Sequence, residues 1–323
     1  MSSVLERTGD AKKMKMITST KKTFEEGYEE YVLDMKSRNL RDGTIRHYDQ
    51  AIKQIYKRIP AKMLIENFDA KTMPNFIIQL RDDPNLNDVS MRTYARDLKT
   101  IMRFFMRSGY LEHFEIKIPK ADKEPIETYS DDELKKLLVK PDLRKCSFAH
   151  YRSWVIICLI LSTGLRQNSV INLRCKDIDF DNRMLYVNVT KNRKPLIVPL
   201  NEDMTKIFAE YLQYRKAEGE DWLFCNIYGK KLVRSTIYHG LWDYCHFRGV
   251  ERTGIHRFRH TFAKKWVTMG GSVVTLQRVL GHSSLAITEN YINMLVSDLK
   301  KDLDEINIIR SLKPSHLSMK KKP

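Results

Sequence analysis

Three short stretches of this 323-residue sequence hold the side-chain types that phosphoryl transfer needs. Arg166 ends the string STGLR, and His256 and Arg259 lie three residues apart in GIHRFRHTFA. In VLGHSSLAITENYINML, His282 follows a glycine and Tyr291 comes nine residues later. Transfer of a phosphodiester without a metal needs a nucleophile, cations that stabilise the non-bridging oxygens, and a proton donor for the leaving oxygen. Tyrosine, arginine, and histidine or lysine can fill these three roles.

Each stretch taken alone has an ordinary structural interpretation. Tyr291 could be an aromatic of a core or an interface, and His282 could belong to a turn. His256 and Arg259 share one face of a predicted helix and could form a structural pair, although the free N–H groups of a helix N-terminus also favour an anion. The order and spacing of the whole set must therefore carry any functional argument.

Apolar spacing and capping signals predict the elements that would position these residues. Thr23 with Glu26 and Ser130 with Glu133 form capping-box patterns. Helices are predicted from residue 24 and over 44–59, 71–81, 90–107, 131–139, 153–161, 204–216, 235–247, 256–269, 273–280 and 297–309. Strands are predicted over 177–180, 184–190 and 196–200. The sequence thus predicts a mainly α protein with one small β-sheet.

Length and composition favour two domains. We expect a flexible basic arm over 1–22 and a helical domain over 23–115. Two prolines and many charges indicate a linker over 116–129. A second, catalytic domain is expected over 130–310 and a disordered tail over 311–323.

The fourth predicted helix carries a row of cations. Arg92, Arg96, Lys99 and Arg103 are spaced by four, three and four residues and therefore share one face. Phosphates would neutralise the repulsion within this row, and we predict that it faces DNA. A solvated face, or one paired with acids from elsewhere, is the alternative interpretation.

The charge balance points to a polyanionic partner. Lys and Arg total 57 against 40 Asp and Glu, a formal net charge of +17, which suits nucleic acid or an anionic membrane surface. No apolar run approaches the ~20 residues of a membrane helix, and the N-terminus lacks the apolar segment of a secretory signal. A cytoplasmic protein without a membrane partner is expected.

The cysteines predict neither a disulfide framework nor a metal site. They are Cys146, Cys158, Cys175, Cys225 and Cys245, an odd number without a CxxC pair. Free, mostly buried thiols are expected, with no metal and no other cofactor.

Taken together, the three stretches resemble the tyrosine recombinase (phage integrase) family. That family has an Arg after T-G-L, then H-x-x-R, then L-G-H, then a Tyr nine residues beyond that His, and this sequence has all four in the same order. The resemblance covers about 130–295, and the helical unit matches the family's core-binding (SAM-like) domain by pattern. It implies a two-domain architecture, with a helical core-binding domain and a mixed α/β catalytic domain with a small antiparallel sheet, forming a clamp on DNA.

The resemblance also implies catalytic roles. Tyr291 would attack the phosphate, form a 3′-phosphotyrosyl bond and free a 5′-hydroxyl. Arg166 and Arg259 would clamp the scissile phosphate. His256 would help the tyrosine lose its proton, and His282 would donate to a non-bridging oxygen.

Two positions are less certain matches to the family. Its catalytic lysine lies in a β-hairpin turn, where Lys191 fits best and Lys194 is the alternative; this lysine would protonate the leaving oxygen. The family usually has an acidic residue three positions after the first Arg, whereas this sequence has Ser169. An orienting contact to Arg166 is therefore missing or supplied elsewhere.

The implied function is site-specific recombination, as integration and excision of a mobile element or as Xer-type recombination. Its partners would be double-stranded DNA and further copies of the chain, as a dimer per site and a tetramer in synapsis. Accessory DNA-bending or directionality factors are compatible with it. Helix 297–309 would pack on a neighbouring copy or on its own chain. A DNA-binding protein without catalysis and a type IB topoisomerase are the alternative functions.

Overall fold

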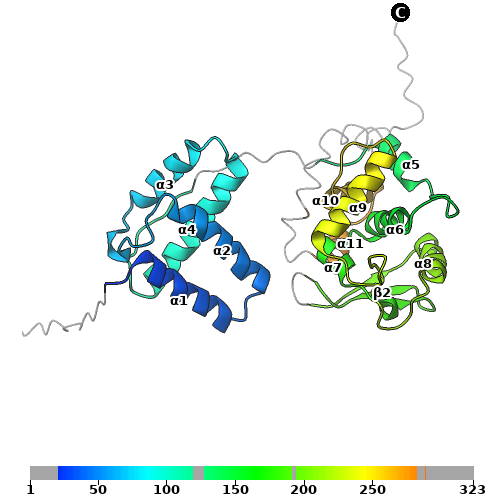
Figure 1. Ribbon diagram of the computed structural model, residues 1–323, viewed down its shortest axis with the longest axis horizontal. Coiled ribbons are helices and arrows are strands. Elements are labelled where there is room, and N and C mark those ends of the chain that lie inside the picture. Colours follow the sequence, from blue (N-terminus) through cyan, green and yellow to red (C-terminus); the bar gives the residue numbers. More distant parts are fainter. Residues whose placement is uncertain (1–20, 119–126, 191–193, 282–287, 289–323) are drawn as a thin grey trace, which may run out of the picture. The chain divides into compact units, whose positions relative to one another are not determined.

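The computed structural model describes residues 21–118, 127–190, 194–281 and 288. The chain divides into two compact units between Lys123 and Glu124, which are coloured blue to cyan and green to orange in Figure 1. Among the described helices, none is long and apolar enough to cross a membrane. The predicted arm (apart from residues 21 and 22), helix 297–309 and the tail lie outside the described residues.

The first unit is built from four helices: α1 (Phe24–Ser37), α2 (Asp42–Tyr56), α3 (Thr72–Arg81) and α4 (Asp88–Arg107). A single 3-10 turn, Ile65–Asn67, lies between α2 and α3. The predicted Thr23–Glu26 capping box is present at α1. Helix α4 begins two residues earlier than predicted, because the side chain of Asn87 accepts the Ser90 N–H and caps it there.

Aromatic side chains dominate the core of this unit. Phe24 makes edge-to-face contacts with Phe68 and Phe105, with ring centroids 5.1 and 5.8 Å apart. Such pairs add stability beyond the area they bury. Ile116 is buried in the same core, so the first residue of the predicted linker packs with the helical unit instead of lying in the linker.

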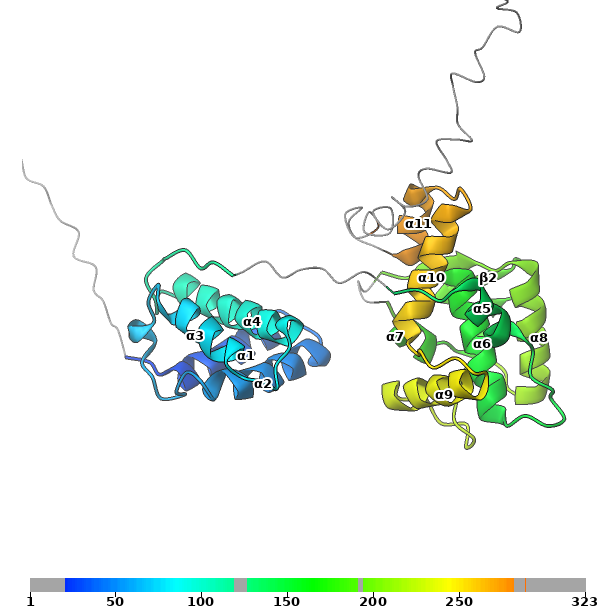
Figure 2. The ribbon, with the colours of Figure 1, turned by 90° about the horizontal axis from the view of Figure 1, so that it is seen from above.

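An apolar helix, α6 (Phe148–Thr163), lies at the centre of the second unit. It contacts four other helices: α5 (Asp131–Leu138), α8 (Glu202–Arg215), α9 (Arg234–Phe247) and α10 (Ile255–Thr268). Figure 2 shows α6 among these helices. Helix α6 is longer than the predicted 153–161, because Ser147 caps its start and Gly164 ends it in a left-handed conformation. Helix α11 (Val273–Leu280) matches its predicted range and packs against α10.

A three-stranded antiparallel sheet completes the unit, in the order β1 (Ile178–Asp179), β2 (Met184–Val187) and β3 (Leu196–Pro199). In β2 and β3, Met184 pairs with Pro199 and Val187 with Leu196. Strand β2 ends three residues before its predicted end. The mainly α fold with a small antiparallel sheet is confirmed.

Candidate active site

Arg166 lies where α6 gives way to the short helix α7 (Gln167–Ile171). Gly164 turns the chain with φ of 64°, a conformation that side chains disfavour. Leu165 is then buried, and Arg166 stands at the N-terminus of α7. Its Nη1 donates to the carbonyl oxygens of Leu280, at 3.0 Å, and Gly281, at 3.4 Å.

Arg259 reaches the same place from α10. It is 5% exposed and donates from Nη1 to the carbonyl oxygen of Gly164 and from Nη2 to that of Leu280, the latter at 3.0 Å. The two arginines, far apart in sequence, thus share the Leu280 carbonyl. The structure brings together the two residues that were predicted to clamp a phosphate.

A cavity of about 620 Å³ opens beside the two arginines. Lys194 and Arg278 also line it. The other lining residues are Leu165, Ser169, Thr190, Pro195, Leu196, Val274, Gln277, Val279, Leu280 and Gly281. Four lining side chains are cationic and none of those lining residues is acidic. Because a cavity with walls of low polarity concentrates the field of its charges, this one attracts anions.

Two hydroxyl groups organise the cavity wall next to the sheet. Ser169 donates from Oγ to the carbonyl oxygen of Val189 at 2.9 Å, and Thr190 donates from Oγ1 to the carbonyl oxygen of Lys194 at 2.6 Å. Ser169, at the position where the family usually has an acidic residue, therefore binds the segment that follows β2. Lys194 lies at the cavity, and Lys191 lies outside the described residues.

His256, at the start of α10, is exposed. Although the residue keeps contact with solvent, neighbouring protein atoms displace part of the water around its imidazole and lower its pKa, and the charges of Arg259, Arg166 and Arg234 lower the pKa further. The neutral ring is therefore favoured at neutral pH and can accept a proton. Arg234, at the start of α9, was missed in the sequence, where a lone arginine belongs to no motif.

The remaining two predicted catalytic residues, His282 and Tyr291, lie outside the described residues. The described stretch 194–281 ends directly before His282, and the carbonyl oxygens of Leu280 and Gly281 accept hydrogen bonds from Arg166. Arg166 and Arg259, the two arginines predicted to clamp a phosphate, are thus bonded to the backbone that directly precedes His282 in the sequence.

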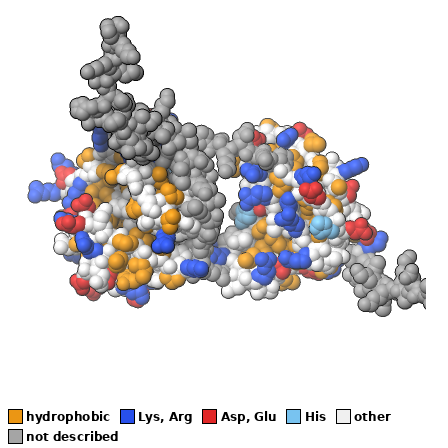
Figure 3. Space-filling model, turned by 180° about the vertical axis from the view of Figure 1, so that it is seen from behind, with side chains coloured by type: hydrophobic (Ala, Val, Ile, Leu, Met, Phe, Trp, Pro, Cys, Tyr) orange, Lys and Arg blue, Asp and Glu red, His pale blue; other side chains and the backbone are white. Residues whose placement is uncertain are grey.

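The predicted DNA-facing row lies on α4 of the first unit. Arg96 and Arg103 are exposed and Arg92 is half-buried, whereas the ammonium group of Lys99 donates to the carbonyl oxygen of Ile116. Figure 3 shows Lys and Arg side chains gathered on one face of this unit. Three of the four residues thus remain candidates for phosphate contacts, and Lys99 has an internal partner.

Neither a disulfide nor a metal cluster is found within the part of the chain that the structure describes. All five cysteines are free, and the described His, Cys, Asp and Glu residues form no group that could hold a metal ion.

The comparison with known families decides the identity. Residues 128–297 match the phage integrase family. The chain belongs to the phage integrase family. Enzymes of this tyrosine recombinase family cleave and rejoin DNA through a tyrosine intermediate, and the matched residues include both arginines, the cavity and the sheet.

Curated relatives of this phage integrase family member cover most of its length. The tyrosine recombinase XerA of Pyrococcus furiosus is 27% identical over 80% of this chain and 89% of its own. The tyrosine recombinase XerD of Staphylococcus epidermidis is 27% identical over 81% of this chain and 85% of its own.

Two solved structures share its fold. One is the Tn1549 transposon integrase in complex with a circular intermediate DNA, with a TM-score of 0.69 and 18% identity over 86% of this chain and 99% of that one. The other is a lambda integrase dimer bound to a COC′ core site, with a TM-score of 0.68 and 18% identity over 84% of this chain and 95% of that one.

Proposed function

We propose that Tyr291 is the nucleophile of a site-specific DNA recombinase. Its phenolate oxygen attacks the scissile phosphorus, a 3′-phosphotyrosyl bond forms, and the 5′-oxygen leaves as a hydroxyl after taking a proton. Attack by the 5′-hydroxyl of another strand reverses these steps, so the phosphodiester bond is conserved without ATP. The observation that carries this proposal is the convergence of Arg166 and Arg259 on the Leu280 carbonyl, beside a cationic cavity.

The two guanidinium groups supply the stabilisation of charge. Arg166 and Arg259 each carry five N–H donors and stay charged at all relevant pH values. Preorganised donors of this kind are worth about 10²–10³-fold in rate each.

Proton transfers fall to the histidines and to a turn lysine in this proposal. Neutral His256 takes the proton of Tyr291, which the lowered imidazole pKa permits. His282 donates to a non-bridging oxygen. Lys191 protonates the leaving 5′-oxygen, and Lys194, at the cavity, is the alternative donor.

Duplex DNA and further copies of the chain are the proposed partners. The relatives of known structure include a lambda integrase dimer on a core site and a tetramer on a Holliday junction. We extend to this chain a dimer per site and a tetramer in synapsis, with the α4 row Arg92, Arg96 and Arg103 on DNA phosphates. Mobile-element integration and excision, or Xer-type recombination, is the proposed task.

A nicked suicide substrate tests the nucleophile. Fragments of the DNA that flanks the gene serve as candidate sites, and the covalent protein–DNA adduct is measured on a denaturing gel. We expect an adduct for wild type and for Tyr214→Phe, an exposed control tyrosine on α8, and none for Tyr291→Phe. An adduct that survives Tyr291→Phe would show that another residue attacks.

A sulfur substitution distinguishes the two lysines. A substrate with sulfur as the 5′-bridging atom releases a thiolate, which needs no proton because thiols are far more acidic than alcohols. Lys191→Ala is expected to cleave the oxygen substrate slowly and the sulfur substrate at the wild-type rate. Rescue of Lys194→Ala alone would assign the proton donor to Lys194.

A further inference from the structure

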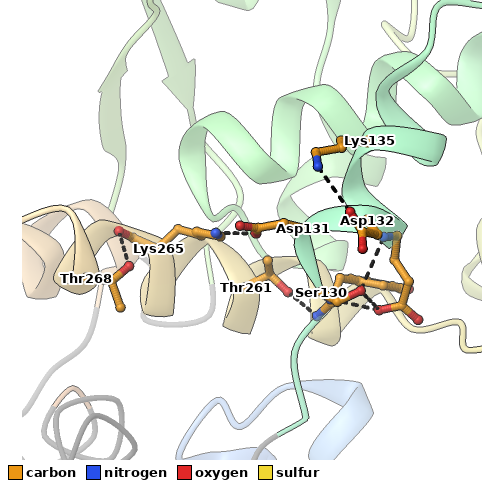
Figure 4. A network of polar contacts seen from close by, with 9 residues as sticks. Ser130, Asp131, Asp132, Lys135, Thr261, Lys265 and Thr268 are labelled. Atoms are coloured by element: carbon orange, nitrogen blue, oxygen red, sulfur yellow. Dashed lines mark hydrogen bonds and ion pairs between the residues drawn. The ribbon is translucent and has the colours of Figure 1, made fainter. Parts of the chain in front are cut away.

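The chain enters the second unit along α10. We call residues 127–131 the α10 strap. At its first residue, Glu127 forms an ion pair with Arg257 of α10, and at its last, Asp131 forms one with Lys265 two turns further along. Figure 4 shows Lys265 reaching Asp131, with Thr261 on the neighbouring turn of the same helix. The strap therefore follows α10 from its first turn to its last.

Tyr129, at the centre of the strap, contacts α10 and its N-terminal cap through its ring, its N–H and its hydroxyl. It is 3% exposed, and its ring stacks on that of Phe258 with centroids 4.4 Å apart. Its N–H donates to Thr261 Oγ1 at 2.9 Å. Its hydroxyl oxygen accepts the N–H of Gly254 at 3.2 Å. Gly254 is the N-cap residue directly before α10.

These contacts bracket the two catalytic candidates on α10. Gly254 precedes His256 by two residues, and Phe258 is adjacent to Arg259. The backbone of a helix turn moves as a unit and sets where its side chains start. Contacts to Gly254 and Phe258 therefore fix the axial position and rotation of the turn that carries His256 and Arg259. Resting on the proposed function of this site, we infer that Tyr129 is a positioning residue that aligns His256 for proton transfer.

Tyr244 provides a matched control. It is also a fully buried tyrosine of this unit, and its hydroxyl donates to the carbonyl oxygen of Leu137 at 3.0 Å. That bond attaches α9 to α5 and does not involve α10. Tyr244→Phe and Tyr129→Phe therefore each remove one buried hydroxyl. Only Tyr129→Phe removes a contact with the N-terminus of α10, the helix that carries His256 and Arg259.

The test measures single-turnover adduct formation, DNA affinity and the thermal midpoint for wild type and both variants. Tyr129→Phe removes the hydrogen bond with Gly254, and Tyr244→Phe removes those with Leu137, Val139 and Arg248. Each lost bond costs about 1 kcal/mol of stability, so Tyr244→Phe should be destabilised at least as much. We expect Tyr129→Phe to slow adduct formation roughly tenfold without changing DNA affinity, because small misplacements of reacting groups lower rates steeply. Tyr244→Phe should react at the wild-type rate. Equal rates in the two variants would overturn the inference.

A double-mutant cycle with His256→Ala distinguishes positioning from general weakening. If Tyr129 acts through His256, the effect of Tyr129→Phe falls to less than about twofold once His256 is absent, since coupled residues are non-additive. An unchanged tenfold effect in the His256→Ala background would assign Tyr129 a merely structural role. Absence of an adduct in wild type would instead refute the proposed function, so the two failures are distinguishable.

Discussion

The hydroxyl of Ser169 donates a 2.9 Å hydrogen bond to the carbonyl oxygen of Val189. This bond joins α7, which begins next to Arg166, to the segment that follows β2. A donor is required at residue 169, because a carbonyl oxygen can only accept. An ionised carboxylate can only accept as well. The serine is thus a chemically distinct solution to holding this turn, and the usual acid of the family could not replace it here.

Restoring that acid should harm the enzyme. Ser169→Asp places a carboxylate against the Val189 carbonyl at a site that is 5% exposed, which is costly. We expect adduct formation at least several-fold slower than in wild type, and Ser169→Ala should show a smaller loss, with about 1 kcal/mol of stability. The single-turnover rate is the measurement. If Ser169→Asp cleaved as fast as wild type or faster, the hydrogen-bond argument would be wrong.

The α4 row should contribute unequally to DNA binding. Arg96→Ala is expected to lower the slope of log affinity against log salt by roughly one unit, because one phosphate contact is lost. Lys99→Ala should change the slope less, since the ammonium group of Lys99 is bonded to the Ile116 carbonyl. Binding titrations over a range of salt concentrations measure both slopes. Equal slopes for the two variants would contradict this assignment.

Gly164 should tolerate substitution worse than another left-handed glycine. Its φ is +64°, and a Cβ there would lie 2.5 Å from Phe262 and 2.6 Å from Leu280. Gly249 has φ of +67° with nothing within 4 Å of its Cβ position. Gly249→Ala should cost about 1 kcal/mol of unfolding free energy, and Gly164→Ala about 1–3 kcal/mol more through overpacking. Urea unfolding compares them, and equal losses would count against the steric argument.

The free energy of unfolding should decrease at acidic pH because the unfolded chain protonates His260 more readily than the folded chain does. Burial lowers the pKa of its imidazole to about 4, with help from the charges of His256 and Arg259. Between pH of about 6.5, the unfolded value, and about 4, the unfolded chain binds a proton that the folded chain does not. The free energy of unfolding therefore decreases as pH falls through this window, by an amount on the order of 2 kcal/mol from this residue.

The variant His260→Gln removes that titration. Urea unfolding at several pH values is expected to show a shallower acid decline for the variant than for wild type. Parallel curves for the two proteins would mean that His260 is protonated in the folded state like an ordinary histidine.

Local signals in the sequence predicted most helices of the fold. Helix α11 has its predicted bounds because Ser272 caps its start and Gly281 follows it in a left-handed conformation. Strand β2 was predicted too long, since the apolar alternation continues to Thr190 while that side chain turns to bond the Lys194 carbonyl. Helix α7 was missed, because its five residues are too few for a periodic pattern.

Long-range contacts at the site were beyond local patterns. The convergence of Arg166 and Arg259 was expected only from the family resemblance, because no spacing rule relates residues so far apart in sequence. The bond from Lys99 to Ile116 was not predicted, since it depends on how the chain returns along α4. The hold of Tyr129 on Gly254 likewise spans 125 residues, and the sequence had placed Tyr129 in a linker.

The partners of the two arginines include the main-chain carbonyls of Gly164, Leu280 and Gly281. A carbonyl oxygen is present whichever amino acid occupies the position. These particular contacts therefore do not depend on the functional group of a neighbouring side chain. Relatives could therefore differ in the side chains that line the cavity and still keep these backbone contacts to the two guanidinium groups.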